Sequence, residues 1–320
     1  MNTNVEPGTR NVELTTLSSI RAAAARIEGL VRRTPVIEVS PQLFLKCENL
    51  QPGGAFKIRG ASNMLARLDD RARAAGVITY SSGNHGQALA IAAARLGVRA
   101  EIVMPETAPR VKVEGVERAG ATVIFAGTTL FDRRSRAEAE ASARGLTIVP
   151  PFDHPWIVEG QGTAGLEIVA QQPDVETVYV PIGGGGLIAG VATAVKGLKP
   201  TARVVGVEPA GAAKMTAALA AGEPVSLAST SSIADGLLAL RAGDLTFAHV
   251  RQFVDEVVTV DEAAIAAAVK WLFGEARLVV EPSGAASVAA ALARHHAGRP
   301  AVALVSGGNV DPAAFAHYIA

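Results

Sequence analysis

Short apolar runs alternate with amphipathic stretches along most of the 320-residue chain. The runs are rich in β-branched residues and several are bounded by glycine or proline, which favours strands over buried helices. The stretches between them, among them 58–75, 86–96 and 261–276, repeat their apolar residues with the period of a helix. Strands are predicted over 76–82, 100–105, 121–127, 177–183, 202–209, 256–260 and 301–307.

This alternation is typical of α/β folds, in which parallel sheets are covered by helices on both faces. In such folds ligands bind at the carboxyl ends of the strands. Several predicted strands end in residues with a chemical function, and this clustering is the main functional signal in the sequence. The strand ends concerned are 81–85, 183–186, Glu208 and 306–309.

The composition narrows the classes of function. Thirty basic and thirty acidic residues cancel, so no excess of charge favours nucleic acid or an anionic membrane as a partner. The chain has no 18-residue apolar run and no signal-peptide pattern, so we expect a soluble, cytoplasmic protein. Cys47 is the only cysteine, lies in the apolar run 43–47, and is predicted to be a buried packing residue rather than a nucleophile.

Four consecutive glycines, residues 183–186, end a predicted strand and open a helix of small residues. Amides at the start of a helix bind phosphate because they have no partner within the helix and the helix dipole favours an anion. Gly184, Gly186 and Ala189 match the dinucleotide pattern G-x-G-x-x-A, and Glu208 lies 22 residues beyond Gly186, near where a ribose-binding acid is expected. The phosphate of another cofactor, or a turn without a ligand, explains the same glycines.

Lys57 stands directly before the predicted helix 58–75, in the glycine-flanked segment GAFKIRGA (54–61). The positive end of the helix dipole opposes a cation there, so this amine should lose its proton more easily than a surface lysine. A neutral amine forms a Schiff base with an aldehyde. An imine-forming amine and a phosphate-binding loop together describe pyridoxal 5′-phosphate, which carries both groups on one ring. A solvated lysine at a helix start is the alternative.

Four motifs follow one another along the chain: GAFKIRGA (54–61), SSGNHGQA (81–88), GGGGL (183–187) and SGGN (306–309). In this order they resemble the fold type II pyridoxal-phosphate enzymes, in particular the branch of serine/threonine dehydratases and serine racemases. The resemblance extends from about residue 30 to about residue 309. It implies the two-domain α/β fold of the tryptophan synthase β-like enzymes. A large cofactor-binding domain would comprise 1–53 and 153–320, and a small domain, 54–152, would be inserted into it.

The resemblance implies a role for each motif residue. Lys57 would form the Schiff base with the cofactor, Phe56 would lie against the ring, and Asn84 would bind the 3-hydroxyl. Ser306 would face the pyridine nitrogen; because a hydroxyl does not hold a proton there, the ring is a weaker electron sink, which favours elimination over transamination. Further cofactor contacts are implied for Gly183, Gly184, Gly185, Gly186, Leu187 and Gly236, although a structural turn explains Gly236 equally well.

The segment after the predicted strand 76–82 begins a helix, whose free amides can hold the carboxylate of an amino acid. The predicted carboxylate-binding residues are Ser81, Ser82, Gly83, Asn84 and His85. Ser82 also resembles the serine that exchanges a proton opposite the lysine in the racemases, so Lys57 and Ser82 are the predicted catalytic residues. Glu281 either approaches the cofactor or, as we favour, caps the helix that follows it.

The family pattern includes a divalent cation held by a glutamate, a backbone carbonyl four residues on and an aspartate two further. These positions are Glu208, Ala212 and Lys214 here. A protonated lysine cannot bind a hard cation and brings a positive charge of its own. We therefore expect no metal and predict that the Lys214 ammonium pairs with Glu208. The same substitution is similar to that in dehydratases of bulkier β-hydroxy amino acids, including phenylserine dehydratases.

The expected reaction is α,β-elimination from an L-β-hydroxy amino acid of the threonine or serine type, or from 3-phenylserine, to give a 2-oxo acid and ammonia. A racemase or a 3-hydroxyaspartate dehydratase on the same scaffold is the nearest alternative. An NAD-dependent oxidoreductase is more remote, because it leaves Lys57, Asn84 and Ser306 without roles. Relatives imply a homo-oligomer, most simply a dimer. Candidates for an aromatic pocket wall, which core packing explains equally well, are Phe131, Phe152 and Trp156.

Overall fold

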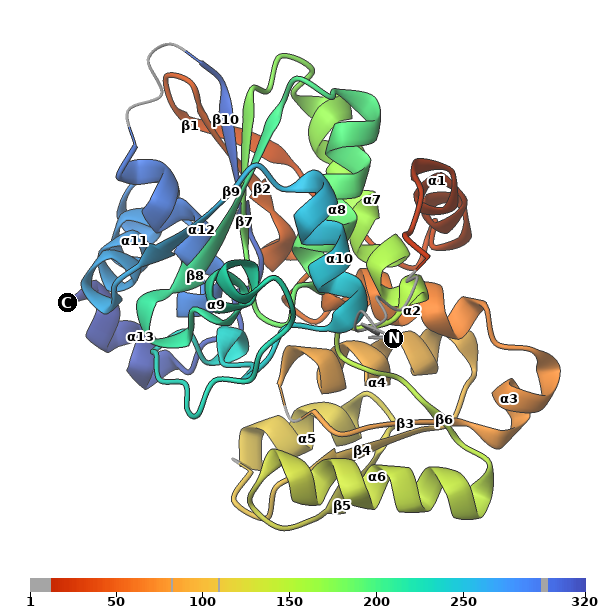
Figure 1. Ribbon diagram of the computed structural model, residues 1–320. Coiled ribbons are helices and arrows are strands. Elements are labelled where there is room, and N and C mark those ends of the chain that lie inside the picture. The colour runs from red at the N-terminus through yellow and green to blue at the C-terminus, as the bar shows by residue number, and fades with distance from the viewer. Residues whose placement is uncertain (1–12, 82, 109, 295–298) are drawn as a thin grey trace, which may run out of the picture.

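The structure is a computed structural model that describes residues 13–81, 83–108, 110–294 and 299–320. Its elements form two parts, each built on one sheet (Figure 1). The larger sheet has the strand order β1 (Val36–Ser40), β2 (Leu43–Cys47), β10 (Ala301–Val305), β7 (Thr177–Pro181), β8 (Arg203–Pro209) and β9 (Glu256–Val260). The smaller sheet has the order β5 (Thr122–Phe125), β4 (Ala100–Met104), β3 (Val77–Thr79) and β6 (Thr147–Ile148).

Each strand predicted from the sequence is present, and the α/β class is confirmed. The pattern missed β6, which is only two residues long, and the hairpin of β1 and β2, whose outer strand is half-buried and carries Glu38 in its middle. Strands β1 and β2 pair antiparallel, whereas the other neighbours in both sheets are parallel. The predicted parallel sheets are therefore present, with one antiparallel strand, β1, at the edge of the larger sheet. The chain reverses there through Pro41 and Gln42, and Gln42 adopts φ 70°.

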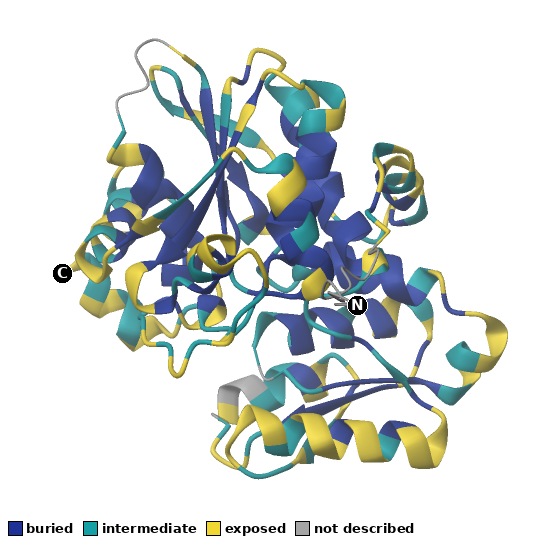
Figure 2. Cartoon of the chain, viewed as in Figure 1, coloured by how far each residue is buried: buried dark blue, intermediate teal, exposed yellow. Residues whose placement is uncertain are grey.

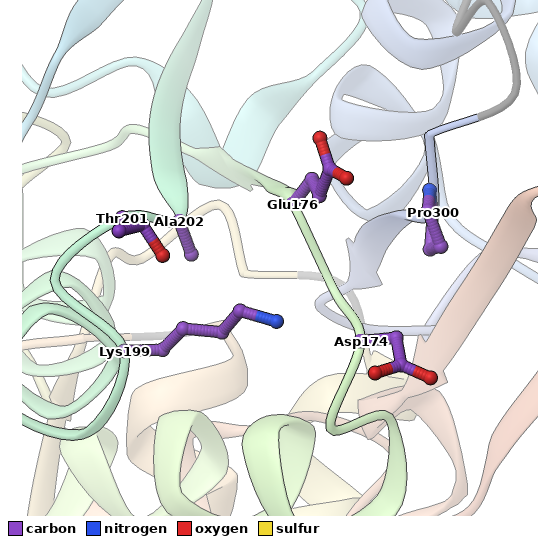
Figure 3. A pocket seen from close by; sticks show the side chains of 6 residues that line it. All are labelled: Asp174, Glu176, Lys199, Thr201, Ala202 and Pro300. Atoms are coloured by element: carbon purple, nitrogen blue, oxygen red, sulfur yellow. The ribbon is translucent and has the colours of Figure 1, made fainter.

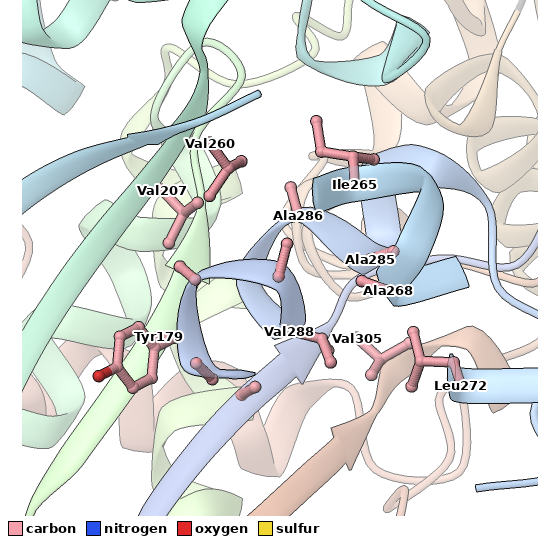
Figure 4. Close-up of a cluster of buried hydrophobic side chains, with 14 of the residues drawn as sticks. Tyr179, Val207, Val260, Ile265, Ala268, Leu272, Ala285, Ala286, Val288 and Val305 are labelled. Atoms are coloured by element: carbon pink, nitrogen blue, oxygen red, sulfur yellow. The ribbon is translucent and has the colours of Figure 1, made fainter. Parts of the chain in front are cut away.

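The two faces of the larger sheet are covered by different helices, because successive side chains of a strand point to opposite faces. On β7, Val178 and Val180 pack toward α7 (Pro155–Gln171), α8 (Gly186–Leu198) and α10 (Asp244–Phe253). Tyr179, between them, packs toward α11 (Glu262–Gly274) and α12 (Pro282–Leu292). Figure 4 shows this second core, with Tyr179 and Val207 of the sheet beside the small residues of α12. Figure 2 shows most of α8 and the central strands in the colour of buried residues.

The smaller sheet is also covered on both faces. Helices α2 (Lys57–Ala66), α4 (Asn84–Leu96) and α5 (Arg110–Arg118) share one core with it, and α6 (Leu130–Arg144) covers the other face. The predicted single helix 58–75 is wrong, because the chain leaves the helix after α2 and starts α3 (Asp70–Ala75). Asp69 causes the new start, since its side chain caps α3 by accepting a hydrogen bond from the amide of Ala72 at 2.7 Å.

The remaining helices lie at the periphery or in connections: α1 (Leu17–Arg26), η1 (Glu48–Leu50), η2 (Ala210–Ala212), α9 (Lys214–Ala221), η3 (Asp235–Leu237) and α13 (Pro312–Ile319). Strands of the smaller sheet lie within 77–148 and those of the larger sheet outside it. The domain boundaries at residues 53/54 and 152/153 stay a prediction, because α2 packs against both α4 and α7. Within the described residues no helix is both long and apolar enough to cross a membrane. Cys47 is fully buried and its pKa is raised to about 12 by burial, which confirms a packing role.

The buried side chain of His249, on α10, connects the segment before α1 to α8 through hydrogen bonds. The amide of Thr15 donates to Nε2 of His249 at 3.1 Å, and Nδ1 of His249 lies 2.9 Å from the hydroxyl of Thr193. That hydroxyl donates to the carbonyl of Ala189, so the imidazole donates from Nδ1 and accepts at Nε2. The arrangement requires a neutral ring, and burial lowers the pKa of His249 to about 4.

Acid is therefore expected to weaken this connection. An unfolded histidine has a pKa of about 6.5, so the contribution of His249 to the free energy of unfolding is complete above that pH and is lost between about 6.5 and 4. We expect His249→Gln to cost on the order of 2 kcal/mol at pH 7 and much less at pH 4, in urea unfolding followed by circular dichroism. A difference between the two proteins that stays constant from pH 7 to 4 would contradict the assignment.

Candidate active site

Lys57 is the first residue of α2 and is partly buried. Its Nζ donates to the carbonyl of Pro151 at 2.7 Å and lies 5.1 Å from the centre of the Phe56 ring. Burial lowers the pKa of Lys57 to about 8, because an ammonium group loses hydration in this position. The sequence predicted the direction of this shift from the helix dipole, whereas the structure assigns burial as its cause. The neutral form of this amine is therefore reached more easily than that of an exposed lysine.

The Lys57 segment pairs directly with the SGGN motif. The amide of Phe56 donates to the carbonyl of Ser306 at 3.0 Å, and Ala55 forms a bridge with Gly307. Ser306 directly follows β10, is buried, and places its hydroxyl 3.4 Å from the carbonyl of Ser283. Two motifs that lie about 250 residues apart in sequence are thus joined through backbone hydrogen bonds at the carboxyl end of the larger sheet.

The glycine loop follows β7 and leads into α8, which no side chain caps. An ideal Cβ at Gly184 would lie 2.3 Å from the ring of Phe152, and one at Gly186 would lie 3.0 Å from the same residue. Gly185 adopts φ 99°, which side chains rarely tolerate. Only glycines fit here, and among the described residues no side chain caps the amides at the start of α8. Because Pro151 precedes Phe152, the Lys57 amine and the glycine loop are joined by one short segment.

Gly236 lies against this loop, since an ideal Cβ at Gly183 would be 3.0 Å from the carbonyl of Gly236. The amide of Gly236 donates to the hydroxyl of Ser283 at 2.9 Å. Ser283 therefore contacts both the Gly236 segment and Ser306, a connection that the sequence did not reveal. The side chain of Leu187, the first residue after the glycines, is buried in an apolar cluster, so Leu187 could contact a phosphate only through its backbone.

Asn84 links the two parts of the molecule. Its Nδ2 donates to Oε1 of Glu281 at 2.7 Å, and its Oδ1 accepts from Nδ2 of Asn309 at 2.9 Å. Asn309 also donates to the carbonyl of Gly53 at 2.7 Å. Glu281 precedes α12, but its side chain makes no capping hydrogen bond, so the capping interpretation is wrong. The carboxylate lies at the site instead, where an ideal Cβ at Gly307 would come 2.2 Å from it.

The predicted carboxylate-binding segment starts α4, which has Gly83 at its N-cap and no side-chain cap. Ser81 lies at this turn and is partly exposed, while Ser82 lies outside the described residues. The imidazole of His85 is buried and donates from Nε2 to the carbonyl of Val149 at 3.0 Å. Burial is the main cause and the charge of Lys57 the second cause of a pKa lowered to about 3 for His85. The ring is therefore neutral, and its Nε2 is already engaged by the carbonyl of Val149.

Glu208 is fully buried and has no free oxygen for a ribose. Its Oε1 accepts from the amide of Met215 at 2.8 Å, and its Oε2 accepts from the amide and hydroxyl of Thr216 at 2.9 and 2.8 Å. The dinucleotide interpretation, which needed this carboxylate, is wrong. The predicted contact of Glu208 with Lys214 is present, with Oε1 and Nζ 3.2 Å apart. Within the described ranges, no group of three or more histidine, cysteine or acidic side chains is arranged to hold a metal ion.

The three aromatic residues that the sequence suggested for a pocket wall lie in different places. Phe152 covers the glycine loop, Phe131 is 77% exposed on α6, and Trp156 stacks with the guanidinium of Arg67 at 4.5 Å. Phe152 is therefore the one of these three that the structure brings to the site.

A buried ion-pair cluster supports the start of α2, and the sequence analysis missed it. Arg59, two residues after Lys57, donates to Glu48 from Nε and one terminal nitrogen at 2.7 and 2.8 Å. It also donates to Glu167 at 2.7 and 2.8 Å, and Lys46 contacts the same carboxylate at 2.5 Å. Arg59, Glu48 and Lys46 are fully buried. The signal available in the sequence was the charge of Lys46 inside an apolar run.

A pocket of about 520 Å³ lies at the amino ends of strands β7, β8 and β10 of the larger sheet (Figure 3). This is the end of the sheet opposite to the candidate active site. The side chain of Lys199 points from one side of this pocket toward Asp174 and Glu176 on the other. Parallel sheets bind ligands at their carboxyl ends, which is where the residues around Lys57 converge. This pocket is not part of the candidate active site.

Pyridoxal phosphate, the cofactor that the sequence resemblance implies, fits the residues that the structure brings together. The uncapped start of α8, built from glycines that admit no side chain, suits a phosphate. Lys57 supplies an amine with a lowered pKa, and a neutral hydroxyl rather than a carboxylate follows β10 at Ser306. These residues would hold the phosphate, the aldehyde carbon and the ring nitrogen, respectively.

Comparison with known proteins agrees with this geometry. A family model described as "Pyridoxal-phosphate dependent enzyme" matches residues 27–307. The chain is 44% identical to a serine racemase of Oryza sativa subsp. indica, over 92% of this chain and 91% of that protein. It is 37% identical to an L-threo-3-hydroxyaspartate ammonia-lyase of a Pseudomonas species, over 94% and 97%. The structure of the processed form of threonine deaminase isoform 2 from Solanum lycopersicum superimposes with a TM-score of 0.89 at 34% identity, over 99% of this chain and 93% of that one.

Proposed function

The chain belongs to the pyridoxal-phosphate dependent enzymes, and on that premise we propose that it is a dehydratase that converts an L-β-hydroxy amino acid to a 2-oxo acid and ammonia. One observation carries the proposal. The amide of Phe56, the residue before Lys57, donates a hydrogen bond to the carbonyl of Ser306. This bond joins the segment that carries a readily deprotonated amine to the residue that carries a neutral hydroxyl at the end of β10. That combination favours removal of an α-proton followed by loss of a β-substituent.

Different residues of the chain bind the substrate and move its proton. When bound, the cofactor withdraws electrons from the α-carbon and so acidifies its proton. The free amides at the start of α4 bind the substrate carboxylate and orient the α-carbon. The Lys57 amine takes the α-proton and can return it to the departing β-hydroxyl, so that the two leave together as water. The released enamine tautomerises and takes up water, which yields the 2-oxo acid and ammonia.

Racemisation is a second candidate, which the similarity to the rice serine racemase supports. It requires a second proton carrier on the face of the α-carbon opposite Lys57. Ser82, the residue predicted for that role, lies outside the described residues. The dehydratase proposal needs only Lys57, and so it is the one for which the described residues supply the acid–base group.

Turnover of four substrates by the holoenzyme tests the proposal. L-Serine, L-threonine, 3-phenylserine and 3-hydroxyaspartate are each incubated with the enzyme, and 2-oxo acid, ammonia and the D-isomer are measured. We expect equal amounts of 2-oxo acid and ammonia, with L-threonine or L-serine turned over fastest. Faster release from 3-phenylserine or 3-hydroxyaspartate would keep the reaction and assign a different side chain. Formation of the D-isomer without ammonia would replace elimination by racemisation, and no change in any substrate would contradict both candidates.

We also propose that the enzyme is a cytoplasmic homodimer, as the family resemblance implies. Light scattering during size-exclusion chromatography tests the dimer, since the chain mass is 32.8 kDa and a dimer has twice that value. Elution at the mass of one chain would contradict it.

A further inference from the structure

Lys214 is a fully buried lysine to which the proposed reaction assigns no role. It is the first residue of α9, where the helix dipole opposes a cation. Its Nζ lies 2.7 Å from the carbonyl oxygen of Ile182, 3.0 Å from those of Ala212 and Leu237, and 3.2 Å from Oε1 of Glu208. The nitrogen is thus surrounded by four oxygens that come from four different segments.

These contacts require the charged form of the lysine. A neutral amine has two hydrogens, whereas Nζ donates to three carbonyl oxygens and also faces a carboxylate. Burial pulls the pKa of Lys214 below its usual value, and the charge of Glu208 opposes that effect. An ammonium group with three donated hydrogen bonds and a buried counter-ion is the form that this geometry stabilises.

Two of the four oxygens belong to the segments that face the cofactor site. Ile182 directly precedes the glycine loop, and Leu237 directly follows Gly236. Gly183 and Gly236 approach each other closely, since an ideal Cβ at Gly183 would lie 3.0 Å from the carbonyl of Gly236. The ammonium group binds the carbonyl next to each of these glycines and so fixes their approach.

We propose that the Lys214 ammonium is a built-in cation that holds the glycine loop and the Gly236 segment together, in place of a bound metal ion. Lys214 is in this view a positioning residue for the cofactor site. The oxygens that a hard cation would need at Glu208 and Ala212 are already bound by Nζ. The inference rests on membership of the pyridoxal-phosphate family, but not on which amino acid is the substrate or on whether elimination follows.

Two measurements without any amino-acid substrate test it: thermal unfolding of the cofactor-free protein, and titration with pyridoxal phosphate followed by absorbance. Lys214→Met leaves Glu208 buried without its counter-ion and three carbonyls without a donor. We expect the unfolding temperature to fall by about 5 °C or more. Half-saturation should need at least about tenfold more pyridoxal phosphate, because the cofactor must then order the loop itself. Lys270→Met is the matched control, since Lys270 is exposed on α11 and bonds only to the carbonyl of Ala320 among the described residues.

A designed metal site gives the complementary result. Lys214→Asp places a second carboxylate among the same carbonyl oxygens, which together suit a divalent cation. Mg²⁺ should raise the unfolding temperature of the cofactor-free Lys214→Asp protein, and a chelator should reverse the effect, while the original protein responds to neither. If Lys214→Met does not fold, Glu208→Gln/Lys214→Met, which removes both charges, should recover folded protein.

Three results would overturn the inference. The first is a Lys214→Met protein with unchanged unfolding temperature and unchanged pyridoxal phosphate affinity. The second is an original protein that Mg²⁺ stabilises and a chelator destabilises. The third is a double variant no more stable than Lys214→Met alone. None of these depends on turnover, so a failure of the dehydratase proposal would be recognised separately.

Discussion

Replacing Lys57 with alanine is expected to reduce turnover of the preferred substrate by a factor of at least about 10³, because the variant loses the group that moves the α-proton. The side chain is only partly buried, and its amine donates to the Pro151 carbonyl rather than to a buried charge. The fold should therefore survive, with an unfolding temperature within a few degrees of the original. Rates are measured as 2-oxo acid release with saturating pyridoxal phosphate.

Lys57→Arg is the matched control for charge. A guanidinium keeps a cation in place but does not lose its proton in proteins, so this variant should be as inactive as Lys57→Ala. Borohydride treatment followed by peptide mass analysis supplies an independent readout. Only the original protein should carry the reduced cofactor on the peptide containing residue 57. Turnover by Lys57→Arg, or labelling of a different lysine, would remove Lys57 from its assigned role.

Replacing Arg59 with methionine is expected to lower the free energy of unfolding by about 3–5 kcal/mol, the usual cost of leaving a buried charge without its partner. Arg59 is fully buried and makes paired hydrogen bonds with Glu48 and Glu167, which come from η1 and α7. Burial alone would raise the pKa of Glu48, but the nearby charge and hydrogen bonds of Arg59 hold it below its usual value. Methionine fills much of the volume, but it leaves the Glu48 carboxylate with the hydrogen bonds from Thr34 and Gln51 and the more distant charge of Lys46.

The control for Arg59→Met is the same substitution in an exposed arginine–glutamate ion pair. Arg110 and Glu114 are 2.6 Å apart on α5, but Arg110 is 92% exposed, so Arg110→Met should change stability by less than about 0.5 kcal/mol. Both variants are measured by urea unfolding at pH 7. Because Arg59 follows Lys57 by two residues, Arg59→Met should also raise the concentration of pyridoxal phosphate needed for half-saturation. Equal effects of the two substitutions would show that burial of the Arg59 cluster does not govern its energy.

The local patterns of the sequence predicted the α/β class, the strands of both sheets other than β1, β2 and β6, and the convergence of four motifs at one site. A short stretch of sequence is enough to indicate each of these features, because a buried strand needs apolar residues and a phosphate-binding helix start needs glycine. Lys57 was recognisable for the same reason, since a cation at a helix start between glycines departs from local preference. The sequence also singled out the pairing of Lys214 with Glu208.

Only the tertiary structure decided which distant groups complete these local features. The partners of Lys214 at Ile182 and Leu237 are backbone carbonyls, which every residue has and no sequence pattern marks. Arg59 finds Glu167 at a separation of 108 residues, and Asn84 finds Glu281 at a separation of 197. Such contacts depend on how all the helices and sheets pack together, and local propensity does not contain that information. Sequence alone determined which chemistry the chain carries, and packing decided which neighbours hold it in place.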